Sequence, residues 1–285
     1  MPEQTGKTIG KGVELEWAIV YWALRRSGMT FPEIQKRHPK LKPYSNSISL
    51  EAQQNVEAIA KMYGESVLKT AKHSDEIAMR LPPGIPEPKT DVLFKKGGKL
   101  IPCSVKMKKV GYQLTSAEGK TSAKLLQAAM KSAKGITAKE KKRITEVIKE
   151  ISKLPTKMLD PKNMAKAIKQ RPNTVKEILG RGTKIPKEKD YQYWKQYAKS
   201  GLMEGLNGVM SIRKFKSAVI KEALTGEGLF GKSSPATAKV VLVGGKAKPI
   251  NTSLINSIAA TTKIDVRSKA RKGITSLALR ITAPS

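Results

Sequence analysis

The sequence predicts an α/β fold in which strands from both ends of the chain build one sheet. Three observations support this prediction. Apolar residues recur at helical spacing near the start, short alternating runs typical of strands occur early and again late, and a Lys-rich helical pattern lies between them. We therefore expect a core formed by residues 1–121 and 205–285, with residues 122–204 as a helical insertion or cap.

The first 80 residues are expected to be mainly helical. Residues 13–26, VELEWAIVYWALRR, place their apolar side chains at helical spacing and predict an amphipathic helix. Ser49 precedes a second segment whose composition favours a long helix ending near His73. A short helical piece is expected over residues 75–80.

A β-hairpin is expected after the proline-rich loop LPPGIPEPK. The following segment, TDVLFKKGGKLIPCSVKMKK, contains two short alternating runs around a KKGGK turn. The pattern then becomes helical and Lys-rich from Ser122 to about Tyr197, with Pro and Gly separating several short helices. The last third returns to strands in AKVVLVGG, KIDVRSK and ITSLALRITA, after a helix that ends in IKEALTG.

The charge of the chain indicates a polyanionic partner. The 285 residues include 55 Lys and Arg against 23 Asp and Glu, a formal net charge of +32. Self-repulsion of this size is usually offset by a polyanion, and nucleic acid is the first candidate. A membrane surface is disfavoured because the basic residues run through nearly the whole chain rather than beside an anchor.

The cysteine and histidine content restricts both compartment and metal chemistry. Cys103 is the one cysteine, so no internal disulfide can form, and the start MPEQTGKTIGKG lacks the apolar core of a signal peptide. We therefore expect a reducing, cytoplasmic setting. His38 and His73 stand alone at no metal-ligand spacing, which argues against a zinc site.

Two motifs have competing interpretations. The string GEGLFGKS at residues 226–233 matches the phosphate-loop pattern, but a helical segment precedes it and a strand follows it, the reverse of a working phosphate loop. The aromatic and Lys-rich cluster YQYWKQY at residues 191–197 could stack nucleic-acid bases. Packing in a helical core is the expectation we favour, because large aromatic side chains mainly fill cores.

A third constellation suggests phosphodiester chemistry. If the runs PKTDVLF and CSVKMKK form adjacent strands, Asp91 and Lys106 could lie near each other. A carboxylate can hold a divalent cation and an ammonium can orient or deprotonate water, while a glutamate from a helix would complete the metal shell. The alternative is that Asp91 is a strand-end carboxylate and Lys106 is one solvated lysine among many.

The stretch from PKTDVLF to SVKMKKVGYQLTSAEG resembles the PD-(D/E)XK nuclease superfamily, in particular phage-encoded and restriction-endonuclease-like members. The resemblance covers roughly residues 10–120 and, more loosely, the EALTG segment at residues 222–226 and the closing strands. It implies a restriction-endonuclease-like core with a mixed sheet flanked by helices. Asp91 matches the metal-binding Asp, Lys106 the catalytic Lys, and Gln113 a Gln that often follows it. Ser104 departs from the pattern, because the family usually has Asp or Glu there.

The resemblance also implies a Mg²⁺ or Mn²⁺ cofactor held by Asp91 and a helix glutamate. That glutamate would be Glu14 or Glu16, and we assign Glu16. We expect phosphate contacts from the basic side chains nearby, namely Lys95, Lys96, Lys108, Lys109, Lys120 and Lys124.

The leading hypothesis is a phage-encoded, metal-dependent nuclease that hydrolyses phosphodiester bonds of duplex or single-stranded DNA in the host cytoplasm or the virion. The alternative is a catalytically inactive DNA-binding phage structural or packaging protein with the same fold, which Ser104 favours. A third class, an RNA-binding protein, would keep the charge without using Asp91 and Lys106. Further partners would be a second copy of the chain or other phage proteins.

Overall fold

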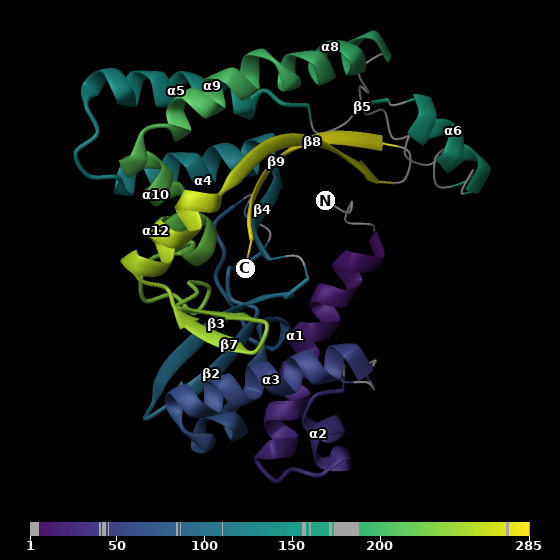
Figure 1. The fold of residues 1–285 in the computed structure, drawn as a ribbon. Helices are drawn as coiled ribbons and strands as arrows, with labels where there is room; N and C mark the ends of the chain where they lie inside the picture. The colour runs from purple at the N-terminus through teal and green to yellow at the C-terminus, as the bar shows by residue number, and fades with distance from the viewer. Residues whose placement is uncertain are drawn as a thin grey trace. The chain divides into compact units, whose positions relative to one another are not determined.

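The computed structural model describes residues 6–39, 41, 44, 46–83, 85, 87–109, 111–155, 158–159, 161–170, 173, 188–271 and 274–284. Contacts divide the chain into two compact units (Figure 1). Unit 1 contains residues 1–113, 220–261 and 283–285, and unit 2 contains residues 114–219 and 262–282. These units differ from the expected division at residues 122–204, because the helix-rich unit also contains the closing strands.

Unit 1 is built on a mixed sheet of five strands flanked by helices. The strand order is β1-β2-β3-β6-β7. β3 and β6 run parallel, whereas the other neighbours are antiparallel. The strands are β1 (Lys72–His73), β2 (Val92–Lys96), β3 (Lys99–Lys106), β6 (Val240–Val243) and β7 (Lys246–Pro249).

The expected hairpin is present as β2 and β3. Gly97 and Gly98 have φ values of +52° and +80°, which a side chain would make costly, and the turn therefore depends on this Gly-Gly pair. Val92 lies opposite Cys103 and Lys96 lies opposite Lys99. β6 has all four residues buried, as expected for a strand in a parallel pair.

Two helices form the core of unit 1 with this sheet. α1 (Gly6–Arg26) packs against α3 (Asn46–Tyr63) and contacts β1, β2 and β3 (Figure 1). The predicted helix that was to end near His73 ends ten residues earlier, because Gly64 adopts a φ of +94°. A 3₁₀ helix, η1 (Glu65–Thr70), and β1 follow instead, and the piece expected over residues 75–80 is the single turn η2 (Ser74–Glu76).

The remaining helices that belong wholly or partly to unit 1 are shorter than α1 and α3. α2 (Phe31–Arg37) follows α1 and begins at a capping box formed by Thr30 and Glu33. α10 (Arg213–Thr225) crosses from unit 2 into unit 1, and α11 (Glu227–Phe230) and α12 (Thr252–Thr261) follow it. Neither α12 nor β7 was predicted.

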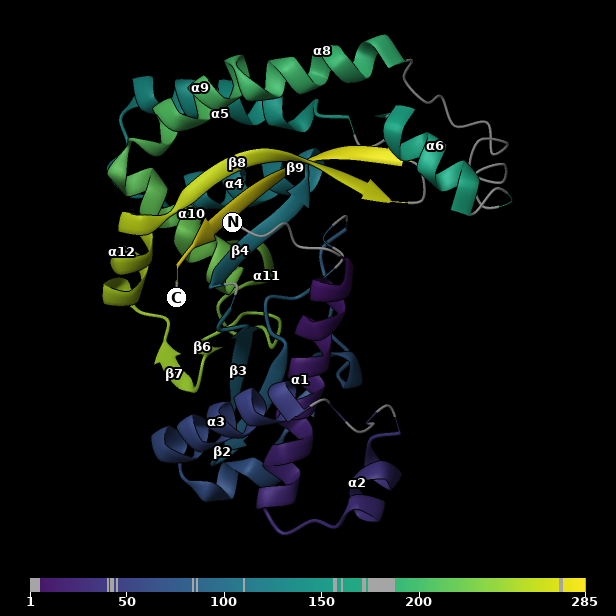
Figure 2. The ribbon, with the colours of Figure 1, turned by 45° about the vertical axis from the view of Figure 1, so that its right-hand side comes forward.

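Unit 2 combines helices with a second sheet (Figure 2). The strands have the order β4-β9-β5, and β8 pairs with β9. The prediction of one sheet built from both ends was therefore wrong: β6 joins β3, but β8 and β9 pair with each other. The elements are β4 (Tyr112–Glu118), α4 (Gly119–Ser132), α5 (Ala138–Ser152), β5 (Met158–Leu159), α6 (Pro161–Gln170), α8 (Glu188–Lys199), α9 (Gly201–Met210), β8 (Lys263–Arg271) and β9 (Ile274–Ala283).

Of the helices described, none is long and apolar enough to cross a bilayer.

Candidate active site

Asp91 lies where β2 begins, and its carboxylate extends the edge of the β2–β3 ladder. The Asp91 backbone N–H donates to the Cys103 carbonyl at 2.8 Å. Its Oδ2 accepts a 2.6 Å hydrogen bond from the Val105 backbone N–H. Val105 lies two residues beyond Cys103, the last residue of β3 that pairs with β2, so the Asp91 side chain replaces a missing strand partner.

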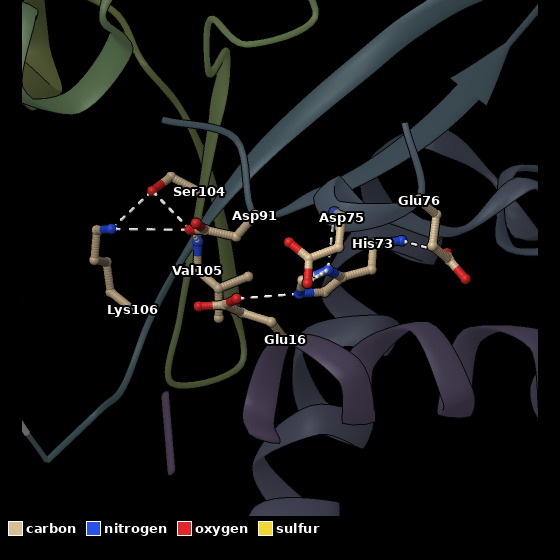
Figure 3. Close-up of polar contacts among 8 residues, drawn as sticks. All are labelled: Glu16, His73, Asp75, Glu76, Asp91, Ser104, Val105 and Lys106. Carbon is tan, nitrogen blue, oxygen red and sulfur yellow. Dashed lines mark hydrogen bonds and ion pairs between the residues drawn. The ribbon is translucent and has the colours of Figure 1, made fainter. Parts of the chain in front are cut away.

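Ser104 and Lys106 come from the same side of β3, two residues apart, and both reach Asp91 (Figure 3). The Ser104 hydroxyl lies 3.2 Å from Asp91 Oδ2, and the Lys106 ammonium donates to Ser104 Oγ at 2.8 Å. The Lys106 Nζ is 4.0 Å from Asp91 Oδ2. The structure therefore brings together the carboxylate, hydroxyl and ammonium that the sequence placed on adjacent strands.

Glu16 on α1 faces the same cluster. Burial, followed by repulsion from Asp91, raises the pKa of Glu16 to about 7, whereas a hydrogen bond from His73 and attraction to Lys106 oppose the rise. Of the pair Glu14 and Glu16, Glu16 is the residue assigned from the sequence, and it is repelled by Asp91.

His73 connects Glu16 to a second layer of polar groups (Figure 3). Its Nδ1 accepts a 3.1 Å hydrogen bond from the Asp75 backbone N–H, so the proton of the neutral ring lies on Nε2, which is 3.2 Å from Glu16 Oε2. The ring stacks on Trp17 with centroids 3.9 Å apart. The His73 backbone N–H donates to Glu76, whose other oxygen pairs with His38.

The two histidines stand far apart in the sequence but share a carboxylate partner in the fold. Both are buried, and Glu76 links them. Sequence reasoning missed His73 because its partner Glu16 is 57 residues away. The one local signal was the pair Asp75 and Glu76 directly after it.

Lys89 and Glu222 are two further ionisable side chains whose charges interact near the cluster. Burial and repulsion from Lys106 lower the pKa of Lys89 to about 8, against attraction from Asp91 and Glu222. Glu222 is buried and accepts hydrogen bonds from the backbone N–H groups of Gly228 and Leu229 at 2.8 and 2.9 Å.

The contacts of Glu222 explain the string GEGLFGKS. In a phosphate loop such N–H groups would face an anionic ligand, but two of them already bind a carboxylate of the chain itself. The string also follows α10 and precedes β6, as the sequence analysis expected. The described geometry therefore does not form a phosphate loop.

The described residues offer a magnesium ion only a small number of ligands. Within the described residues, no group of three or more His, Cys, Asp or Glu side chains is placed to hold a metal. Mg²⁺ commonly binds one or two carboxylates and takes its other ligands from water and phosphate. Asp91 Oδ1 and Glu16 Oε1 accept no hydrogen bond from the described part of the chain, and these two oxygens fit that role.

The other predicted residues lie at different distances from the cluster. Lys108 and Lys109 are exposed and follow β3 at the Asp91 end of the hairpin. Lys95 and Lys96 are exposed near its turn, roughly 15 Å away for four or five residues of strand. Gln113 lies on β4, and among the described residues no hydrogen bond joins its side chain to Asp91 or Lys106. Lys120 and Lys124 belong to α4 of unit 2.

Comparison with known proteins identifies no relative of this chain. No protein-family model, curated protein or solved structure matches it.

Proposed function

We propose that this protein binds DNA and hydrolyses phosphodiester bonds in a Mg²⁺- or Mn²⁺-dependent reaction. The observation that carries the proposal is the convergence of Asp91, Ser104 and Lys106 at one end of the hairpin, with Glu16 close enough to be repelled by Asp91. The mixed sheet with α1 packed on it also supports a restriction-endonuclease-like identity for unit 1.

Each side chain has a role that follows from its contacts. Asp91 and Glu16 would hold the cation, which when bound would stabilise charge on the phosphate and acidify a water molecule. Lys106 is partly exposed and has three N–H donors, of which one goes to Ser104, so another could hold a phosphate oxygen. Ser104 holds the Lys106 ammonium beside the Asp91 carboxylate, because its hydroxyl contacts both groups.

The distribution of charge supports DNA as the substrate. Unit 2 carries 31 Lys and Arg against 10 Asp and Glu, a net charge of +21, and unit 1 carries 24 against 13, a net charge of +11. Both units therefore attract phosphate, and affinity should fall steeply as salt is raised.

A second candidate function is DNA binding without hydrolysis. Ser104 stands where the resembling nucleases have a carboxylate, and the described residues hold no group of three or more metal-binding side chains. A protein of this kind would bind DNA through its Lys and Arg side chains and keep the cluster of Asp91, Ser104 and Lys106 as a structural feature of the sheet.

One paired experiment separates the two functions. Supercoiled plasmid is incubated with the full chain in Mg²⁺ or in EDTA, while DNA binding is measured over a salt series for the wild type and Lys106→Met. Hydrolysis predicts nicking in Mg²⁺ that EDTA abolishes and the variant loses, with binding retained. Equal binding and no nicking by either protein would replace the nuclease with the DNA-binding protein, and tighter binding to structured RNA would disfavour both.

A further inference from the structure

One side of α8 carries aromatic rings at the surface of unit 2. Tyr193 is 62% exposed, although the sequence analysis favoured burial of this cluster in a helical core. The Tyr193 ring lies parallel to that of Tyr197, with centroids 6.2 Å apart and planes within 4°. Trp194 meets both rings edge-on, at 5.6 and 5.9 Å. Trp194 and Tyr197 are half-buried, and Ala198, the residue after Tyr197, is buried.

A contact with α5 holds this aromatic cluster, Tyr193, Trp194 and Tyr197, in place. The Tyr197 hydroxyl donates a 2.8 Å hydrogen bond to Glu150 on α5, and the other Glu150 oxygen pairs with Lys153 at 2.6 Å. Burial and this carboxylate raise the pKa of Tyr197 to about 12, so the hydroxyl keeps the proton that it donates. Tyr197 is therefore fixed, and Tyr193 presents its ring to solvent beside it.

The surroundings of the aromatic cluster select an anionic partner. Lysines are interleaved with the rings on α8, at Lys195 and Lys199, and α5 carries the exposed Lys149 one residue before Glu150, the partner of Tyr197. An apolar protein surface would gain little from such a charge, whereas a single-stranded nucleic acid offers both phosphates and stackable rings. Bases inside a duplex are stacked on each other, so only unpaired bases present a free face.

We propose that the aromatic cluster on α8 binds single-stranded DNA by stacking an unpaired base on Tyr193, with lysines of α8 and α5 holding the adjacent phosphates. This inference rests on the proposed DNA binding but not on hydrolysis. It names the kind of DNA, a strand with exposed bases, and a site for it in unit 2.

The test separates binding that depends on the bases of the DNA from binding that depends on its charged phosphates. Binding of the full chain to a labelled oligo-dT is measured in EDTA, beside an oligonucleotide of the same length made of abasic sites, which has the same phosphates without bases. The variants are Tyr193→Ala, Tyr193→Phe, which keeps the ring, and Lys199→Gln, which removes one charge. Circular dichroism checks that each variant is folded, as expected for exposed positions.

The inference predicts that the wild type prefers oligo-dT by roughly 5- to 100-fold, since stacking contributes about 1–3 kcal/mol per base. Tyr193→Ala should lose most of this preference and Tyr193→Phe should keep it, whereas Lys199→Gln should weaken both oligonucleotides alike. Equal wild-type affinity for the two oligonucleotides would overturn the stacking site and leave DNA binding intact. Failure to bind either would overturn binding of single-stranded DNA, and the plasmid experiment above decides binding of duplex DNA separately.

Discussion

Replacement of Glu16 by Gln should change how the stability of the protein depends on pH. Gln retains an oxygen that can accept the hydrogen bond from His73 Nε2, so the contact at 3.2 Å can persist. The substitution removes the ionisable group that faces Asp91 and Lys106. It therefore tests the environment of Glu16, in which burial contributes most to the raised pKa and repulsion from Asp91 comes second.

The sign and size of the effect follow from the pKa of Glu16. This pKa is about 7 in the folded protein and 4.5 in the unfolded chain. Between these values the unfolded chain loses the proton more readily, so the free energy of unfolding falls as pH rises from 4.5 to 7. At about 1.4 kcal/mol per pKa unit, the loss is about 3 kcal/mol. Below pH 4.5 the carboxyl is protonated in both states and this destabilisation is absent.

Urea unfolding of the wild type and Glu16→Gln at pH 4, 6 and 8 in EDTA measures the prediction. The stability of the variant relative to the wild type should rise by about 3 kcal/mol from pH 4 to pH 8. Glu33→Gln is a control of opposite sign, because hydrogen bonds from Thr30 lower the pKa of Glu33. Added Mg²⁺ at pH 8 should stabilise the wild type more than Glu16→Gln. A relative stability of Glu16→Gln that is the same at all three pH values would refute the reasoning.

Substitutions at three further positions, Ser104, Gly226 and Glu222, test the packing around the site by urea unfolding. Ser104→Ala should lower the free energy of unfolding by about 2 kcal/mol, because its buried hydroxyl contacts two charged groups. Gly226→Ala should cost more than Gly28→Ala: both residues have positive φ, but only at Gly226 would a Cβ lie 2.9 Å from Lys89 Cγ. Glu222→Ala should cost about 2–4 kcal/mol and Glu222→Gln less, since Gln can still accept one of the two N–H groups. Equal costs within either pair would contradict these contacts.

The parts of the fold that depend on local chemistry could be predicted from the sequence. The hairpin follows from alternating apolar residues and from Gly97 and Gly98, which allow the turn. The first helix follows from its apolar spacing. The premature end of α3 could also have been predicted, because Gly64 after Tyr63 is a common signal for a helix terminus.

Partners distant in the sequence could not be predicted in the same way. The alternation in β8 and β9 identifies strands, but it does not say which sheet they join, and the two strands pair with each other instead of with β3. The same reason hid the link from His73 to Glu16 and the approach of Lys89 to Glu222. Asp91 and Lys106 could be paired in advance because a single tight turn separates their strands.

The rate of plasmid nicking in Mg²⁺ by the wild type and Asp91→Asn tests the central claim most directly. Both proteins are used at concentrations that saturate the DNA, so that a difference in binding does not affect the comparison. Asn keeps an oxygen for the Val105 N–H but lacks the charge that would hold the cation. The account predicts a wild-type rate at least about 100-fold above that of the variant. Equal rates, or no nicking by the wild type, would contradict it.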